Sequence, residues 1–180
     1  IERVETTLLS VPLHTPFVTA LRRTTTIETV VVRLTDSDGC VGWGEAPQVW
    51  QVTGDSLAGS RACLDGPLAD ALVQAPADPT ETAPIIQRAV VGNRSAKMAA
   101  DVALHDLAAR RAGVPLAVHL AALAGRPPGA GGAARVRTDV TLAAGDADGL
   151  AEAARARVAD GFSTLKLKVG TDAATDVARV

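Results

Sequence analysis

The period of the hydrophobic pattern changes twice along these 180 residues, which divides the chain into regions of different secondary structure. Residues 1–9, 27–35 and 40–46 are rich in alternating or β-branched residues and are typical of strands. The turn signal "DSDG" at 36–39 predicts a hairpin between the last two strands. Residues 11–26 contain two prolines and end in polar residues, so we expect a long loop there.

From residue 56 the apolar residues recur with a period of about 3.6, which predicts helices. The predicted helices span 56–74, 80–91, 93–113 and 115–124. Ser56 is a candidate N-cap of the first helix, and Asn93 or Ser95 is a candidate cap of the third, which Gly113 is expected to end. The first 124 residues therefore predict an α+β domain in which helices back a three-stranded sheet.

The segment "AGRPPGAGGAAR" at 124–135 is dense in glycine and proline. Such composition predicts an exposed connection and marks a domain boundary. We therefore predict one domain over 1–124, a connection over 125–134 and a second domain over 135–180.

Beyond this connection strands alternate with helices. Strands are predicted at 136–142 and 163–169, and helices at 146–160 and from about Thr171. This alternation is typical of a parallel α/β sheet or barrel. A complete (β/α) barrel needs about 250 residues, so we expect either that the biological chain continues or that this is a truncated product.

The composition argues against several classes of protein. The chain is 47% apolar and 21% charged, with a net charge of −2, as in soluble globular proteins. Aromatic residues make up only 2%, and there is no basic block, so a nucleic-acid partner is not expected. No apolar run approaches the ~20 residues that span a bilayer. Cys40 and Cys63 lack metal-ligand spacing, which favours reduced thiols in a cytoplasmic protein.

The segment "GFSTLKLKVGTD" carries two lysines inside an apolar run. In a strand, residues two apart point to the same side, so Lys166 and Lys168 share one face. The other face carries Leu165, Leu167 and Val169. The pattern alone leaves two interpretations open: an edge strand whose solvated lysines block edge-to-edge pairing, or a strand whose lysines line an active site at the interior of a barrel.

A buried lysine pair has a specific chemistry. Mutual repulsion and desolvation both lower the pKa of an ammonium group. One lysine can then serve as a neutral general base while the other remains cationic and binds an anion. Removal of a proton alpha to a carboxylate creates an enediolate dianion, which needs strong electrostatic stabilisation, normally from a divalent metal.

The motif "TLKLKVG" resembles the Lys-x-Lys segment of the muconate lactonizing branch of the enolase superfamily. The segments "VPLHTPFVTALR", "DSDGCVGWGEAP", "VTGDS" and "SAKMAADVALHDLAARRAGVPL" resemble the N-terminal capping domain of that branch, in the same order. The segment "TDVTL" resembles the first barrel strand. The resemblance implies an α+β capping domain followed by the start of a modified TIM barrel.

Within this branch the chain looks most like the dipeptide epimerases, typified by those that act on L-Ala-D/L-Glu. The resemblance implies that Lys168 is the acid/base on one face of the substrate alpha carbon. Lys166 would neutralise the substrate carboxylate and lower the pKa of Lys168. Arg22 would pair with the side-chain carboxylate of a C-terminal Glu, and Thr141 would contact the dipeptide backbone. The alignment of "TALR" favours Arg22, and the sequence leaves Arg23 open as the alternative.

The resemblance also implies Mg²⁺ held by three carboxylates on the next three strands and a second lysine beyond them. Only Asp172 and Asp176 follow the lysine pair, so no metal ligands are expected here and the 180 residues alone are expected to be inactive. The expected partners are a dipeptide substrate and further copies of the chain, with no membrane. Alternatives are a cycloisomerase or o-succinylbenzoate synthase of the same superfamily, or a catalytically inactive fragment with a folding or dimerisation role.

Other polar and aromatic residues have simpler interpretations. Glu45, at the end of a predicted strand, is expected to hold backbone amides or the domain junction. His105 and Asp106 are expected on a helix face or at the domain junction. Trp43 is expected in the core, and Trp50 is a candidate for closing over substrate.

Overall fold

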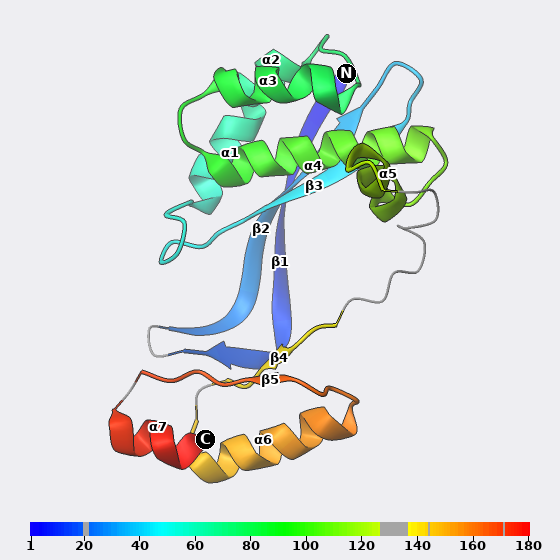
Figure 1. Ribbon diagram of the computed structural model, residues 1–180. Coiled ribbons are helices and arrows are strands. Elements are labelled where there is room, and N and C mark those ends of the chain that lie inside the picture. The colour runs from blue at the N-terminus through cyan, green and yellow to red at the C-terminus, as the bar shows by residue number, and fades with distance from the viewer. Residues whose placement is uncertain (20–21, 127–136, 144, 171) are drawn as a thin grey trace. The chain divides into compact units, whose positions relative to one another are not determined.

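The computed structural model describes residues 1–19, 22–126, 137–143, 145–170 and 172–180 (Figure 1). The chain forms two compact units. Unit 1 comprises Ile1–Ser10 and Ile27–Ala134, and unit 2 comprises Val11–Thr26 and Arg135–Val180. Most of the predicted connection at 125–134 lies outside the described residues. The domain boundaries drawn from the sequence stay a prediction. They did not include the grouping of residues 11–26 with the C-terminal segment.

Unit 1 contains most of a three-stranded sheet of order β1-β2-β3, as predicted. The strands are β1 (Arg3–Val18), β2 (Arg23–Thr35) and β3 (Val41–Pro47). The loop predicted at 11–26 is wrong, because β1 and β2 continue through most of it. Two causes explain the error: an edge strand tolerates proline, and the threonine-rich segment before Ile27 is β-branched and favours strand.

The predicted hairpin between β2 and β3 is confirmed, with antiparallel pairs from Thr29↔Pro47 to Thr35↔Val41. Asp36 organises its turn, because its Oδ1 accepts hydrogen bonds from the backbone N–H of Asp38 at 3.0 Å and of Cys40 at 2.8 Å. Its Oδ2 accepts a bond from Arg111 at 2.9 Å. This carboxylate is buried, and these three donors compensate its loss of solvation.

Five helices follow the sheet: α1 (Leu57–Asp65), α2 (Pro67–Leu72), α3 (Pro79–Ala89), α4 (Arg94–Arg111) and α5 (Leu116–Leu123). Ser56 caps α1 as predicted, accepting from the N–H of Gly59 at 2.9 Å. The single helix predicted over 56–74 is wrong, because Gly66 precedes a proline and lies outside the helical region. None of the described helices is long and apolar enough to cross a bilayer.

Helix α4 lies across β3 (Figure 1), and two glycines allow this contact. A Cβ at Gly42 would overlap the carbonyl oxygen of Ala103, and a Cβ at Gly44 would overlap that of Ala99. The backbones of strand and helix therefore touch directly. The core around this contact contains Val30, Val32, Leu34, Ala46, Leu104 and Leu107, all fully buried.

Two buried hydroxyls of β2, those of Thr29 and Thr35, have no hydrogen-bond partner among the described residues. A buried polar group without a partner lowers stability by about 1–3 kcal/mol. We therefore expect Thr29→Val to raise the melting temperature by about 2–4 °C, measured by circular dichroism. Thr6→Val is the matched control and should lower it, because the Thr6 hydroxyl donates to Asp65. A lower melting temperature for Thr29→Val would contradict the assignment.

The C-terminal segment of unit 2 contains β4 (Val140–Thr141), α6 (Ala147–Ala159), β5 (Leu165–Lys166) and α7 (Ala173–Arg179). Strands β4 and β5 pair in parallel, as the first units of a barrel do. The strands predicted at 136–142 and 163–169 are longer than those observed. Among the described residues β4 pairs only with β5, and two residue pairs form this ladder. The short ladder limits the length of both strands.

Candidate functional site

The parallel register places Thr141 of β4 directly beside Lys166 of β5. The N–H of Leu142 donates to the carbonyl oxygen of Lys166 at 3.0 Å, which fixes this alignment. Residues opposite one another in a ladder have side chains on the same face of the sheet. Two of the predicted site residues, far apart in sequence, are therefore neighbours.

The opposite side of β4 is closed by apolar packing. Leu142, next to Thr141 in the chain, is buried, and so is Leu150 of α6. Because side chains alternate along a strand, burial of Leu142 directs Thr141 to the other face. The two-stranded sheet of β4 and β5 therefore has an apolar side and a polar side. The polar side carries Thr141 and Lys166.

Lys168 follows β5 by two residues and is half-buried, whereas Lys166 is exposed. The described residues alone therefore do not desolvate both amines.

Arg22 lies in the turn between β1 and β2, in the same compact unit as the lysine pair. The N–H of Arg22 donates to Oγ1 of Thr19 at 3.2 Å, and the N–H of Thr19 donates to the carbonyl oxygen of Arg22 at 2.9 Å. These bonds hold Thr19, which follows β1, next to Arg22, which precedes β2. Arg22 is half-buried and Arg23, the first residue of β2, is exposed.

A hollow of about 450 Å³ lies within unit 2. Its walls come from β1, from β4 with the residues after it, and from one side of α6; they include Phe17, Thr141 and Arg157. Phe17 and Arg157 were not singled out from the sequence. The available signal for Phe17 was its rarity, because the chain has only two phenylalanines and no tyrosine.

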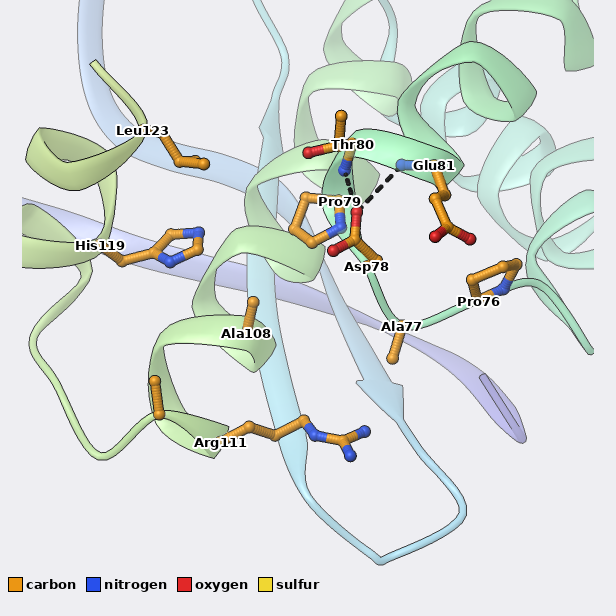
Figure 2. A pocket seen from close by; sticks show the side chains of 11 residues that line it. Pro76, Ala77, Asp78, Pro79, Thr80, Glu81, Ala108, Arg111, His119 and Leu123 are labelled. Carbon is orange, nitrogen blue, oxygen red and sulfur yellow. Dashed lines mark hydrogen bonds between the residues drawn. The ribbon is translucent and has the colours of Figure 1, made fainter. Parts of the chain in front are cut away.

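A second hollow, of about 570 Å³, lies in unit 1 between α3, α4 and α5 (Figure 2). Two of its charged side chains, those of Asp78 and Arg111, are engaged in structural bonds. Oδ1 of Asp78 caps α3 by accepting from Thr80 N–H at 2.8 Å and Glu81 N–H at 3.1 Å. Arg111 is bonded to Asp36 at 2.9 Å. These bonds favour a structural role for this hollow.

The two aspartates after the lysine pair serve α7. Asp172 caps this helix, and its hydrogen bonds from the backbone and side chain of Thr175 hold the pKa of the Asp172 carboxyl below its usual value. Asp176 accepts from the N–H of Gly170 at 2.7 Å. Across the part of the chain that the structure describes, no three His, Cys, Asp or Glu residues form a group that could hold a metal ion.

The remaining candidates lie in unit 1. The prediction that Trp43 belongs to the core is wrong, because its residue is 44% exposed. Asp106 on α4 accepts a hydrogen bond from the N–H of Trp43 at 3.0 Å. Its neighbour His105 places Nδ1 3.1 Å from Nε2 of His119 on α5. Both residues therefore make contacts from the surface of α4, as expected. Glu45 is exposed and makes no hydrogen bond or ion pair with the described residues, so its expected contact with backbone amides is not seen.

Comparison with known proteins identifies relatives along nearly the whole chain. The model of the mandelate racemase / muconate lactonizing enzyme N-terminal domain matches residues 3–120. The L-Ala-D/L-Glu epimerase of Bacillus subtilis (strain 168) is 39% identical over 180 residues, which are 99% of this chain and 47% of that protein. The chain thus spans about half the length of the curated relatives it matches.

Solved structures agree with this comparison. A substrate-liganded complex of the Bacillus subtilis L-Ala-D/L-Glu epimerase superposes with a TM-score of 0.86 at 39% identity, covering 99% of this chain and 48% of that one. A dipeptide epimerase from Cytophaga hutchinsonii, complexed with Mg and the dipeptide D-Ala-L-Val, gives a TM-score of 0.84 at 29% identity, covering 98% of this chain and 46% of that one.

Proposed function

The chain belongs to the mandelate racemase / muconate lactonizing enzyme family, and from this premise we propose that it contributes the N-terminal part of a dipeptide epimerase. The proposed substrates are dipeptides of the L-Ala-D/L-Glu kind, and the proposed reaction is a 1,1-proton transfer at the Glu alpha carbon. The observation that carries this proposal is the similarity to an L-Ala-D/L-Glu epimerase over nearly the whole chain.

The use of lysine in this chain supports a chemical role for the pair. Of its 18 basic residues only three are lysines, and two of these are Lys166 and Lys168. The third, Lys97, is buried and donates to the carbonyl oxygen of Gln87 near the end of α3 at 2.9 Å. A solvated charge can be supplied by arginine, as elsewhere in this chain, but arginine does not give up its proton in proteins. Lysine in place of arginine therefore favours proton transfer by one member of this pair over a merely charged edge.

The proposed roles follow from where these groups lie. Lys166 binds the substrate carboxylate, which makes the alpha proton more acidic. Lys168 takes or returns that proton on one face of the alpha carbon. Thr141, beside Lys166 in the ladder, hydrogen-bonds the dipeptide backbone and so fixes the substrate relative to both amines.

Arg22 is proposed to select the side-chain carboxylate of a C-terminal Glu. A guanidinium presents paired N–H donors that match a carboxylate in a bidentate geometry. The two hydrogen bonds between Thr19 and Arg22 hold the backbone of Arg22 next to the end of β1. Arg23 is exposed and begins β2, so we assign the role to Arg22.

The similarity to dipeptide epimerases complexed with Mg favours Mg²⁺ as the cofactor of the whole enzyme. The described residues do not fit a three-carboxylate site, because Asp172 and Asp176 are engaged at α7. We therefore propose that the ligands lie outside this chain segment, together with a second acid/base lysine. We also propose a cytoplasmic location, in keeping with the free thiols of Cys40 and Cys63.

The test is isotope exchange by the full-length protein. Incubation with L-Ala-L-Glu and Mg²⁺ in D₂O should place deuterium at the Glu alpha carbon and form L-Ala-D-Glu, both detected by NMR. L-Ala-L-Gln is the matched control substrate, because it lacks the carboxylate assigned to Arg22, and it should react much more slowly. Complete retention of the alpha proton would contradict the epimerase assignment and favour another reaction of the family.

A further inference from the structure

The chain just after the lysine pair is held by a side chain of the helix that follows it. The last bond that the structure describes in the β4–β5 ladder joins Leu142 N–H to the carbonyl oxygen of Lys166. Lys168 lies two residues beyond this bond, where the described residues of β4 no longer pair with it. The next described backbone bond is at Gly170, whose N–H donates to Oδ2 of Asp176 on α7 at 2.7 Å. The backbone of Lys168 is therefore held between the ladder on one side and Asp176 on the other.

A further pair of bonds carries this contact to the connection after β4. The other carboxylate oxygen of Asp176, Oδ1, lies 3.3 Å from Nη1 of Arg179, one turn further along α7. Nε of Arg179 donates to the carbonyl oxygen of Gly145 at 2.9 Å. Gly145 lies in the connection between β4 and α6, which begins just after Thr141. One carboxylate–guanidinium pair thus joins the connections that follow both strands of the candidate site.

Arg179 is unusually well shielded from solvent. Its side chain is 11% exposed and that of Asp176 is 22% exposed, whereas the other arginines in the described ion pairs are 35–61% exposed. Taking a guanidinium out of water costs free energy that attraction to one carboxylate only partly offsets. Stability alone therefore explains this pair poorly, and the geometry that it imposes on the two connections explains it better.

The two lysines of the site depend on this pair to different extents. Lys166 lies inside the ladder, so β4 holds its backbone directly. Lys168, the proposed acid/base, lies outside the ladder and shortly before Gly170. Gly170 has a φ of +115°, a conformation that glycine adopts at little cost and that leaves the backbone free to rotate. An outside contact at this glycine is therefore what fixes the direction of the residues before it.

We propose that Asp176 and Arg179 are positioning residues that hold the Lys168 amine at the substrate alpha carbon. The inference rests on the function proposed above, because it concerns the proton transfer assigned to Lys168. A catalytic group has to be held within about 0.5 Å of its productive position by the groups behind it. Both residues act through the backbone, Asp176 at Gly170 and Arg179 at Gly145.

This arrangement predicts a specific kinetic defect. Loss of the Asp176 carboxylate frees the chain after Lys166 but leaves the bond between Lys166 and Leu142 in place. Substrate binding, assigned to Lys166 and Thr141, should then be kept while proton transfer slows. Because Lys168 works on one face of the alpha carbon, the defect should be confined to that face. The second acid/base lysine proposed for the other face should still exchange the alpha proton of the dipeptide that it attacks.

The test uses the full-length protein with L-Ala-L-Glu and L-Ala-D-Glu in D₂O, followed by NMR. Asp176→Ala should lower kcat for epimerisation about 10–100-fold, the effect of a small misplacement, and change KM by less than about threefold. It should slow exchange of the alpha proton in one of the two dipeptides far more than in the other. Asp176→Asn keeps an oxygen that can accept from Gly170 N–H, so it should retain kcat within about fivefold.

Two further variants separate positioning from a general loss of structure. Arg179→Met should give the same face-specific defect, and the variant that combines it with Asp176→Ala should be within about twofold of Asp176→Ala alone, because the two side chains act in one network. Asp160→Ala is the matched control. It removes an Asp–Arg pair of the same spacing, Arg157–Asp160 on α6, and should leave kcat and KM unchanged. Rates are compared per folded protein, determined by circular dichroism.

The possible failures can be told apart. If the unchanged protein epimerises the dipeptides but Asp176→Ala and Arg179→Met keep a normal kcat, the positioning role is overturned and the proposed function stands. Equal slowing of exchange in the two dipeptides overturns it as well, because a general loss of structure affects both faces. An unchanged protein that exchanges the alpha proton of neither dipeptide overturns the proposed function, and the positioning role with it. If Asp176→Ala does not fold, Arg179→Met against Asp160→Ala makes the same face-specific comparison.

Discussion

Gly44→Ala is expected to destabilise unit 1 severely. The added Cβ would overlap the carbonyl oxygen of Ala99 and lie 2.8 Å from its carbonyl carbon. Both are backbone atoms of α4, so the clash cannot be relieved by rotating a side chain. The strand and helix would have to separate, which would loosen the fully buried core around Val32 and Leu104. We expect a loss of more than about 4 kcal/mol, against a total stability of about 5–15 kcal/mol for a typical domain.

Gly39→Ala is the matched control for this prediction. Gly39 has a φ of +79°, which disfavours alanine, but no atom lies within 4 Å of the Cβ that would be added. Its expected cost is therefore about 1–2 kcal/mol from backbone conformation alone. Urea unfolding followed by circular dichroism should rank Gly44→Ala far below Gly39→Ala. Equal stabilities of the two variants would mean that α4 and β3 are not in direct backbone contact.

This contact also shows where inference from sequence reached its limit in the fold. The sequence predicted the hairpin from its turn signal and the helices from their period, because both signals are local. The glycines of "GWGEA" carry no local sign that a helix some sixty residues away packs on them. The extension of β1 through Pro12 and Pro16 was missed for a similar reason, since proline is tolerated only if the strand lies at the edge of its sheet.

Some features of the candidate site are local in sequence and could be predicted, whereas others depend on contacts between distant segments. That Lys166 and Lys168 share a face follows from the two-residue period of a strand, but the alignment of Thr141 with Lys166 depends on the pairing of two strands. The grouping of the Arg22 turn with the lysine strand in one compact unit is likewise a long-range property. Trp43 was misplaced because periodicity locates two faces of a strand without saying which one the helices cover.

Lys168→Arg is the sharpest test of the proposed chemistry in the full-length enzyme. Arginine keeps the positive charge and most of the length but cannot act as a base near neutral pH. If Lys168 transfers the alpha proton, kcat for epimerisation of L-Ala-L-Glu should fall by about 10²–10⁴-fold, the usual contribution of general acid–base catalysis. If Lys168 merely contributes positive charge at a solvated edge, the substitution should be almost without effect. Measurement of kcat and KM by NMR separates these two outcomes.

Lys166→Arg provides the matched comparison within the same strand. Lys166 is proposed to act as a cation that binds the substrate carboxylate, and arginine preserves that charge. This variant should therefore raise KM and keep a measurable kcat, whereas Lys166→Met should lose both binding and turnover. Addition of methylamine should partly restore Lys168→Ala, because a small amine can occupy the vacated space and supply the missing base. Equal loss of kcat in Lys166→Arg and Lys168→Arg, with no rescue by amine, would contradict the assignment of the base to Lys168 and of the cation to Lys166, because a cation-binding role survives substitution by arginine.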